Sequence, residues 1–409
     1  MTARKNQTSS PRNRQPALCS ESTELHLDTR LAIQRLKQVM IERRSLKPAF
    51  YLRHPFLQTA MASLKFRVSG ELLRRKSEFH LIKTSNGARL LSSYAKQTNP
   101  KGVVLLLHGW EGGIESTYVL RTGEYLMRRG YSIFRLNLRD HGETHHLNDE
   151  PFNGTMLDEV YEAMCEGAAF EHQGKYLPAY MIGFSLGGNF VLRMALAHSI
   201  RRQKIRNLRH VLAVSPAVDP AMATKRIDQD FLLRPYFLQK WSESLLKKQK
   251  LFPYLHNFDF INKVRSVMEL TETGIDQFTP FDTAKEYFQG YTIAGDFFQK
   301  LTVPTTIITS ADDPIITEED FIKINPHPLL RTIITDKGGH NGFLVRGFHP
   351  AYLDLFDEIV AESTAATGFD PKPKGRKPAP KVQNVKKVKN KPGSKASANL
   401  NKQQKQLSA

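Results

Sequence analysis

A serine flanked by glycines is the first candidate for chemistry in this chain. The segment Gly183-Phe184-Ser185-Leu186-Gly187 follows an apolar stretch and precedes an amphipathic one. A G-x-S-x-G sequence between a strand and a helix is typical of a nucleophile elbow, where the glycines permit a tight turn and the serine Oγ projects from the sheet. The N-terminus of the following helix favours developing negative charge. The alternative is a chance match in a glycine-rich loop.

A nucleophilic serine needs a base, and His340 fits that role. It lies in Lys337-Gly338-Gly339-His340-Asn341-Gly342-Phe343, directly after an apolar stretch that ends near Thr335. A glycine-rich loop in this place can carry an imidazole toward the elbow. An ordinary loop histidine is the alternative interpretation.

The base needs a carboxylate to orient it, and three aspartates compete. Asp312 and Asp313 follow the apolar stretch Thr305 to Ser310, and Asp219 follows an earlier one. We predict Asp313 as the orienting acid and expect Asp312 to cap the turn. The resulting chain order is serine, aspartate, histidine, as expected of an α/β fold with a nucleophile elbow.

A tetrahedral intermediate needs amide donors for its oxyanion. We predict the backbone N–H groups of Leu186 and Trp110, the latter in the loop Leu107-His108-Gly109-Trp110-Glu111-Gly112-Gly113. His108 is expected to shape this loop rather than to transfer protons.

The segments Leu107 to Gly113, Gly183 to Asn189, Ala311 to Pro314 and Gly339-His340, with His54-Pro55-Phe56-Leu57-Gln58-Thr59 upstream, resemble the YheT-like group of α/β-hydrolases. The resemblance covers about residues 50 to 365. It implies a carboxylic-ester hydrolase fold and the triad of Ser185, Asp313 and His340.

A histidine-containing segment, Asp140-His141-Gly142-Glu143-Thr144-His145-His146, could be mistaken for a metal site. Its spacing matches no H-x-x-x-H or Cys/His signature, so we expect neither a metal nor a cofactor. The neighbouring Arg139 has two open interpretations. It binds a substrate carboxylate or phosphate, or it forms a structural salt bridge.

The elements that must position these residues alternate along the chain. Apolar runs at Val103 to Leu107, Tyr131 to Leu138, Ala179 to Phe184, His210 to Ser215, Thr305 to Ser310 and Thr332 to Thr335 predict strands. Amphipathic segments at Tyr118 to Arg129, Met156 to Glu171, Gly188 to Ser199 and Ala351 to Ser363 predict helices between them. The pattern indicates an α/β-hydrolase fold, with a mostly parallel central sheet and helices on both faces. A hairpin is expected at Phe79 to Thr84 and Leu90 to Ala95, across Asn86-Gly87.

Domain boundaries follow from composition and spacing. We predict a disordered basic leader (1–19), an N-terminal extension (20–78), a core (79–215 and 301–366), an inserted helical cap (216–300) and a disordered Lys-rich tail (367–409). The formal net charge of +19 resides mainly at the two ends, since Pro371 to Ala409 contain 11 Lys and one Arg without any acid. The chain between them is nearly balanced, which argues against a nucleic-acid-binding core.

These observations together predict a cytoplasmic serine hydrolase that cleaves a small carboxylic ester through an acyl-enzyme intermediate. An acyltransferase or a thioesterase on the same triad is one alternative. A non-catalytic binding protein is another, in which the basic tail contacts an anionic membrane or RNA. No obligate protein partner is expected.

Overall fold

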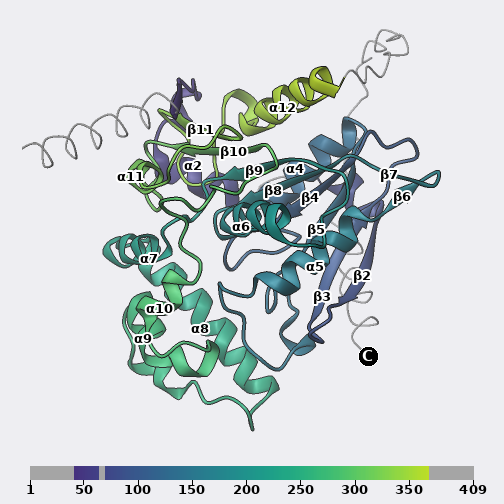
Figure 1. Ribbon diagram of the computed structural model, residues 1–409. Coiled ribbons are helices and arrows are strands. Elements are labelled where there is room, and N and C mark those ends of the chain that lie inside the picture. The colour runs from purple at the N-terminus through teal and green to yellow at the C-terminus, as the bar shows by residue number, and fades with distance from the viewer. Residues whose placement is uncertain (1–40, 64–69, 368–409) are drawn as a thin grey trace, which may run out of the picture. The chain divides into compact units, whose positions relative to one another are not determined.

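The computed structural model describes residues 41–63 and 70–367. The predicted leader, residues 20–40 and 64–69 of the N-terminal extension and the Lys-rich tail beyond residue 367 lie outside this range. The described chain builds a nine-stranded sheet in the order β1-β11-β10-β9-β8-β4-β5-β3-β2 (Figure 1). Its strands are β1 (Ile41–Arg44), β2 (Ser77–Lys83), β3 (Arg89–Ala95), β4 (Val103–Leu107), β5 (Ser132–Leu136), β8 (Ala179–Phe184), β9 (Leu208–Val214), β10 (Thr305–Ser310) and β11 (Leu330–Thr335).

The sheet is mostly parallel, as the alternating pattern predicts. Only β2 with β3 and β3 with β5 pair antiparallel, and every other neighbouring pair is parallel. Parallel neighbours need crossover connections, and the helices between the strands supply them. The predicted hairpin turn forms between β2 and β3, and of its residues Asn86 and Gly87 only Gly87 takes a positive φ, of 86°.

Helices cover both faces of the sheet, which confirms the predicted fold class. Along β4, Val103, Leu105 and Leu107 pack in one core cluster, while Val104 and Leu106 pack in the other. This alternation is the period of two that a strand buried on both faces imposes. The first cluster includes side chains of α5 (Leu157–Ala168) and α6 (Leu186–Ile200), and the second those of α3 (Glu71–Arg75), α4 (Thr117–Arg128) and α12 (Tyr352–Thr367).

Between β9 and β10 the chain forms four helices that we call the cap helices: α7 (Pro220–Gln229), α8 (Leu233–Leu251), α9 (Val267–Phe278) and α10 (Ala284–Gln289). Figure 1 shows them grouped together below the sheet. Helix α8 contacts loops that follow β4 and β5, through Phe237 against Trp110 and Lys248 against Asp140. The cap helices therefore reach the carboxyl edge of the sheet, where open α/β folds place their ligands.

The strand β1 has no counterpart among the sequence-based expectations. Its four residues, Ile-Glu-Arg-Arg, pair in parallel with β11 from Ile41 opposite Thr332 to Arg44 opposite Thr335. Three of the four residues are charged, so β1 has no apolar pattern from which the sequence could predict a strand. Its charges find partners instead, because Arg44 contacts Glu358 and Glu42 contacts Arg331.

The remaining described elements are short. They are α2 (Pro55–Ser63), α11 (Glu318–Ile322), the small hairpin of β6 (Glu171–His172) and β7 (Lys175–Tyr176), and four 3-10 turns at Phe50–Leu52, His145–Leu147, Asp259–Lys263 and Arg346–Phe348. Of the helices that the structure describes, none has the length and apolar character needed to cross a bilayer.

Candidate active site

Ser185 occupies a strained turn between β8 and α6. Its φ of 53° and ψ of −116° lie outside the regions that non-glycine residues favour, at a cost of about 1–3 kcal/mol. A Cβ added to Gly183 would collide with the carbonyl oxygen of Gly187, and one on Gly187 would collide with that of His108. The sequence therefore needs glycine on both sides of the serine, because the backbone passes too close for a side chain.

His340 lies between Ser185 and Asp313. Its Nε2 is 2.9 Å from Ser185 Oγ, and its Nδ1 is 2.9 Å from Asp313 Oδ2. An ionised carboxylate only accepts hydrogen bonds, so Nδ1 carries the proton and Nε2 is left to accept from the serine hydroxyl. The histidine and aspartate are both more than nine-tenths buried. The three residues come from the carboxyl ends of β8, β10 and β11.

Asp313 also caps the turn that follows β10. Its Oδ1 accepts hydrogen bonds from the backbone N–H groups of Ile315 and Ile316, at 2.8 and 3.0 Å. The carboxylate is therefore held by the turn while its other oxygen faces the histidine. The expectation that Asp312 caps this turn is wrong.

Asp312 contacts the histidine loop instead. Its Oδ1 accepts a hydrogen bond from the N–H of Gly339 at 2.9 Å. The third candidate, Asp219, lies at the N-terminus of α7, where its two oxygens accept from Met222 N and Lys323 Nζ. Only Asp313 among the three has a hydrogen bond to His340.

The two residues predicted as oxyanion donors belong to segments that adjoin the serine. Leu186 is the first residue of α6, and the N–H groups of a first helical turn have no partner within the helix. The loop that carries Trp110 packs on the elbow, since a Cβ on Gly109 would be 3.1 Å from Ser185 Cβ. Gly109 N donates to Tyr118 Oη at 3.0 Å, which fixes the loop at this point.

His108 fixes the same loop through hydrogen bonds of both ring nitrogens. Its Nδ1 donates to Gly109 O at 2.7 Å, and its Nε2 accepts from Leu138 N at 3.1 Å. Burial, with a smaller contribution from nearby His141, lowers the pKa of His108 to about 3. The imidazole is therefore neutral and has both nitrogens occupied, so it has no free position from which to move a proton.

Aromatic side chains join this loop to cap helix α8. The ring of Trp110 stacks on Phe237, with centroids 5.3 Å apart and planes 9° apart, and meets Trp241 edge-on at 5.5 Å. Next to it, Glu111 has a pKa that burial raises to about 8, an effect that Lys240 opposes and Asp140 and Glu243 increase. This shift reduces the negative charge that Glu111 carries at neutral pH.

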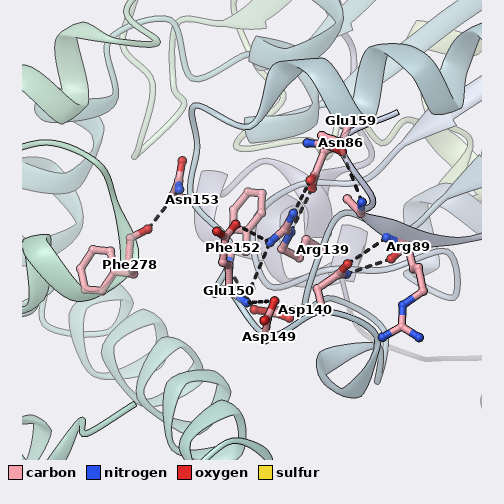
Figure 2. A network of polar contacts seen from close by, with 12 residues as sticks. Asn86, Arg89, Arg139, Asp140, Asp149, Glu150, Phe152, Asn153, Glu159 and Phe278 are labelled. Atoms are coloured by element: carbon pink, nitrogen blue, oxygen red, sulfur yellow. Dashed lines mark hydrogen bonds and ion pairs between the residues drawn. The ribbon is translucent and has the colours of Figure 1, made fainter. Parts of the chain in front are cut away.

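A network of ion pairs and hydrogen bonds holds the segment that follows β5 (Figure 2). Arg139 Nη2 lies 2.6 Å from Glu159 Oε2, and both side chains are buried. Arg139 also contacts Glu150 at 3.2 Å, while Asp140 Oδ2 accepts from Phe152 N at 2.9 Å. The guanidinium is thus engaged by protein carboxylates, which favours the salt-bridge interpretation of Arg139 over a substrate contact.

Lys248 of α8 completes this network, and sequence reasoning missed it. Its Nζ lies 2.6 Å from Asp140 Oδ1 and donates to the carbonyl oxygens of His145 and Asn148 at 2.9 and 2.7 Å. The lysine side chain is only 1% exposed. It follows the buried Trp241 and Leu245 at helical spacing, so a lysine on an otherwise apolar face was the available signal.

Burial shifts the pKa values of Asp140 and Lys248 in opposite directions. It raises the pKa of Asp140 to about 6, against the lowering effect of Lys248, and it lowers the pKa of Lys248.

No group of three or more His, Cys, Asp or Glu side chains suited to a metal occurs among the residues described.

A cavity of about 1170 Å³ lies far from these residues. It is lined by Lys175, Tyr176 and Leu208, which are at or before the amino ends of β8 and β9, and by Cys165 and Arg202 near the ends of α5 and α6. Ser185 follows the carboxyl end of β8. The cavity is therefore at the opposite edge of the sheet and is separate from the candidate active site.

Comparisons with solved structures and a curated relative give distant likenesses. An esterase from Pyrococcus furiosus is 13% identical and has a TM-score of 0.48, with 78% of this chain and 98% of that one covered. An esterase from Exiguobacterium antarcticum is 16% identical at a TM-score of 0.41, with 70% and 100% covered. An uncharacterised protein of Rickettsia prowazekii (strain Madrid E) is 31% identical over 135 residues, which are 32% of this chain. The match spans about half (52%) of that relative's length.

A family model covers the elements that carry the candidate site. The Hydrolase_4 model, described as "Serine aminopeptidase, S33", matches residues 98–341, a segment that includes Trp110, Ser185, Asp313 and His340. The narrower YheT-like resemblance stays a prediction. Since the family model spans more than half of the chain, the protein is a hydrolase of the α/β-hydrolase superfamily and belongs to the serine aminopeptidase S33 family.

Proposed function

We propose that this hydrolase is a serine esterase that cleaves a small carboxylic ester through a covalent acyl-enzyme. The observation that carries the proposal is the continuous line of hydrogen bonds from Asp313 through His340 to Ser185. A nucleophile, a base and a group that orients the base, each within hydrogen-bond reach of the next, are the recurring requirement of this chemistry.

Acylation would begin when Ser185 Oγ attacks the ester carbonyl carbon and its proton passes to Nε2 of His340. The tetrahedral intermediate then collapses, the C–O bond to the alcohol breaks, and the imidazolium returns the proton to the leaving alkoxide. His340 then deprotonates a water molecule, which attacks the acyl carbon. The bond from this carbon to Ser185 Oγ breaks, the imidazolium returns the proton to Oγ, and the carboxylic acid is released. Asp313 stabilises the imidazolium at each stage and keeps Nε2 aimed at the serine.

The N–H groups of Leu186 and Trp110 are the proposed oxyanion donors. Leu186 N–H lies at the positive end of α6, where a helix favours negative charge. Trp110 is tied to the cap through Phe237 and Trp241, so its backbone has little freedom to move away from the site. A donor fixed in this way stabilises charge without reorganising during the reaction.

The family description names an aminopeptidase, which makes a peptide N-terminus the second candidate substrate. Recognition of an α-ammonium group calls for a carboxylate close to the scissile bond. Glu111 belongs to the loop after β4, but burial raises its pKa to about 8, which reduces the negative charge that it can offer at neutral pH. The aromatic surface of Trp110 and Phe237 suits an apolar acyl group better. We therefore favour the ester.

The test compares Ser185→Ala with the wild-type protein. A fluorophosphonate probe should label the wild-type chain at Ser185, since only an activated serine reacts readily. Ser185→Ala should lower kcat on p-nitrophenyl esters by on the order of 10³ or more. Ser199→Ala, at the other end of α6, is the matched control and should keep full activity.

Two outcomes would count against the proposal. Comparable turnover by Ser185→Ala would remove the serine from the mechanism. Faster cleavage of aminoacyl p-nitroanilides than of esters by the wild-type protein would reassign the substrate to the peptidase class. A cytoplasmic location, and a role for the Lys-rich tail in contacting anionic membranes or RNA, remain predictions that a fractionation and a salt-dependent binding assay would test.

A further inference from the structure

The helix α2 lies against the loop that carries His340. This helix contains Gln58 and Thr59 of the His54-Pro55-Phe56-Leu57-Gln58-Thr59 motif, to which the proposed mechanism gives no role. We call the segment from Lys337 to Val345 the histidine loop. It has little regular secondary structure, and apart from Phe343 N, which donates to Gly338 O, its hydrogen-bonded N–H groups have partners outside the loop.

Thr59 holds the histidine residue itself. Its Oγ1 accepts a hydrogen bond from the backbone N–H of His340 at 2.9 Å and donates one to Pro55 O, also at 2.9 Å. The hydroxyl is thus fixed by its own helix and cannot rotate away without losing that second bond. The contact joins positions 281 residues apart in the chain.

Gln58 holds the far end of the histidine loop. Its Oε1 accepts from Leu344 N at 2.7 Å, and its Nε2 donates to Leu344 O at 2.9 Å and to Leu52 O at 2.8 Å. The side chain is completely buried. A buried amide with bonds on both of its ends is costly to disturb, because every group released would remain unpaired.

Close packing leaves no space between helix and loop. A Cβ added to Gly339 would collide with Pro55 O and would lie 2.9 Å from Gln58 Cβ and Thr59 Oγ1. Gly339 also has a φ of +55°, which only glycine adopts without strain. The residue before the histidine is therefore fitted to the surface of α2.

Two further acceptors come from the segments that follow β10 and β9. Gly339 N donates to Asp312 Oδ1 at 2.9 Å, and Asn341 N donates to Ser215 Oγ at 3.3 Å. Three consecutive backbone N–H groups, those of residues 339 to 341, are thus each held by a different side chain. Thr59 holds the central one.

We propose that Thr59 and Gln58 are positioning residues for the reaction, and that α2 acts as a clamp that sets the placement of the His340 imidazole. The inference rests on the proposed role of His340 as the base. A displacement of about 1 Å between reacting groups can cost on the order of 10² in rate, so a loop held from one side only would lose turnover without losing the fold.

Thr59→Val is the first test, because valine keeps the shape of threonine and removes the acceptor for His340 N–H. On a short p-nitrophenyl ester we expect kcat to fall roughly 10- to 100-fold, with KM changed by less than about threefold. Labelling of Ser185 by the fluorophosphonate should slow by a similar factor. Thr59→Ser restores the hydroxyl and should recover most of the rate.

The matched control is Thr305→Val. Thr305 is a buried threonine at the amino end of β10, at the edge of the sheet opposite to the histidine loop, and its hydroxyl donates to Val303 O at 3.0 Å. It should lower the melting temperature without lowering kcat. Gln58→Met is a second variant and should reduce kcat in the same direction, so a folding failure of one variant still leaves a test.

Hydrogen–deuterium exchange separates this inference from the proposed function. Peptides covering residues 337–345 should exchange faster in Thr59→Val than in Thr305→Val, whatever the substrate is. Accelerated exchange with an unchanged kcat would overturn the positioning role, and so would unchanged exchange in a folded Thr59→Val. A wild-type protein that neither labels at Ser185 nor cleaves any acyl substrate would refute the proposed function instead.

Discussion

Replacing Lys248 by methionine tests how much the contact between cap helix α8 and the segment after β5 contributes to stability. Methionine preserves most of the side-chain volume and removes the charge. It leaves the Asp140 carboxylate without its cation, 5% exposed, and it leaves the carbonyl oxygens of His145 and Asn148 without their donor. Removing one partner of a buried ion pair costs about 3–5 kcal/mol, because the other charge stays buried and uncompensated.

The adjacent residue supplies the matched control. Lys247 pairs with Glu143 on the surface, where the two side chains are 37% and 79% exposed. Exposed pairs contribute about 0–1 kcal/mol, so Lys247→Met should cost several-fold less than Lys248→Met. The two substitutions change the net charge equally and lie on the same helix.

The loss at Lys248 should depend on pH. Burial already raises the pKa of Asp140 to about 6, and removal of the nearby cation should raise it further. A carboxyl whose folded-state pKa exceeds its unfolded value of about 3.9 contributes stability below that value and loses it as the pH rises through the folded pKa. The variant can therefore protonate Asp140 at pH 5, and the difference from the wild-type protein should grow between pH 6 and pH 8.

Urea denaturation followed by tryptophan fluorescence measures this directly. The chain has only two tryptophans, Trp110 and Trp241, and both lie where the loop after β4 meets α8. We expect the free energy of unfolding of Lys248→Met to fall more at pH 8 than at pH 5. Equal losses for Lys248→Met and Lys247→Met at both pH values would refute the reasoning.

Three other predictions follow from the site and the sequence. Asp313→Asn should lower kcat by on the order of 10² to 10⁴ through the wrong histidine tautomer. Asp312→Asn should do little, since an amide oxygen can still accept from Gly339 N; steady-state kinetics giving the reverse order would reassign the acid. If the surface of Trp110 and Phe237 contacts the acyl chain, kcat/KM should rise from p-nitrophenyl acetate to medium-chain esters, whereas a preference for acetate would mean that these rings only pack the cap. Deleting Pro371 to Ala409 should leave kcat on a soluble ester unchanged, because the 12 positive charges lie beyond the last predicted helix; a large loss of turnover would place the tail in the active structure.

The sequence located the candidate residues because each follows an apolar strand. Ser185, Asp313 and His340 come directly after runs that read as parallel strands, and the carboxyl ends of parallel strands meet at one edge of a sheet. Local sequence rules are sufficient for such an arrangement. The same rules did not predict the role of Asp312. The sequence does not show which of two adjacent carboxylates caps the turn and which contacts the histidine loop.

The contacts that the sequence did not predict join distant parts of the chain. Thr59 reaches across 281 residues to His340, and Lys248 across 103 to His145. A buried glutamine or a four-residue charged strand has no periodic signature, since its role comes from whichever segment the fold brings against it. The helical spacing from Trp241 and Leu245 places Lys248, and not Lys247, on the buried face of α8, but it does not show that Asp140 is the partner.

The pairing of β1 with β11 has a consequence for shortened forms of this protein. Without residues 41–44, the run Leu-Arg-Thr-Ile-Ile-Thr of β11 would present its unpaired backbone groups at the border of the sheet. An apolar strand left open in this way is a template for association with other chains, and charged side chains are a common means of preventing it. Glu42, Arg43 and Arg44 supply those charges. A chain shortened to the core at residue 79 should therefore aggregate even though it retains all three candidate catalytic residues.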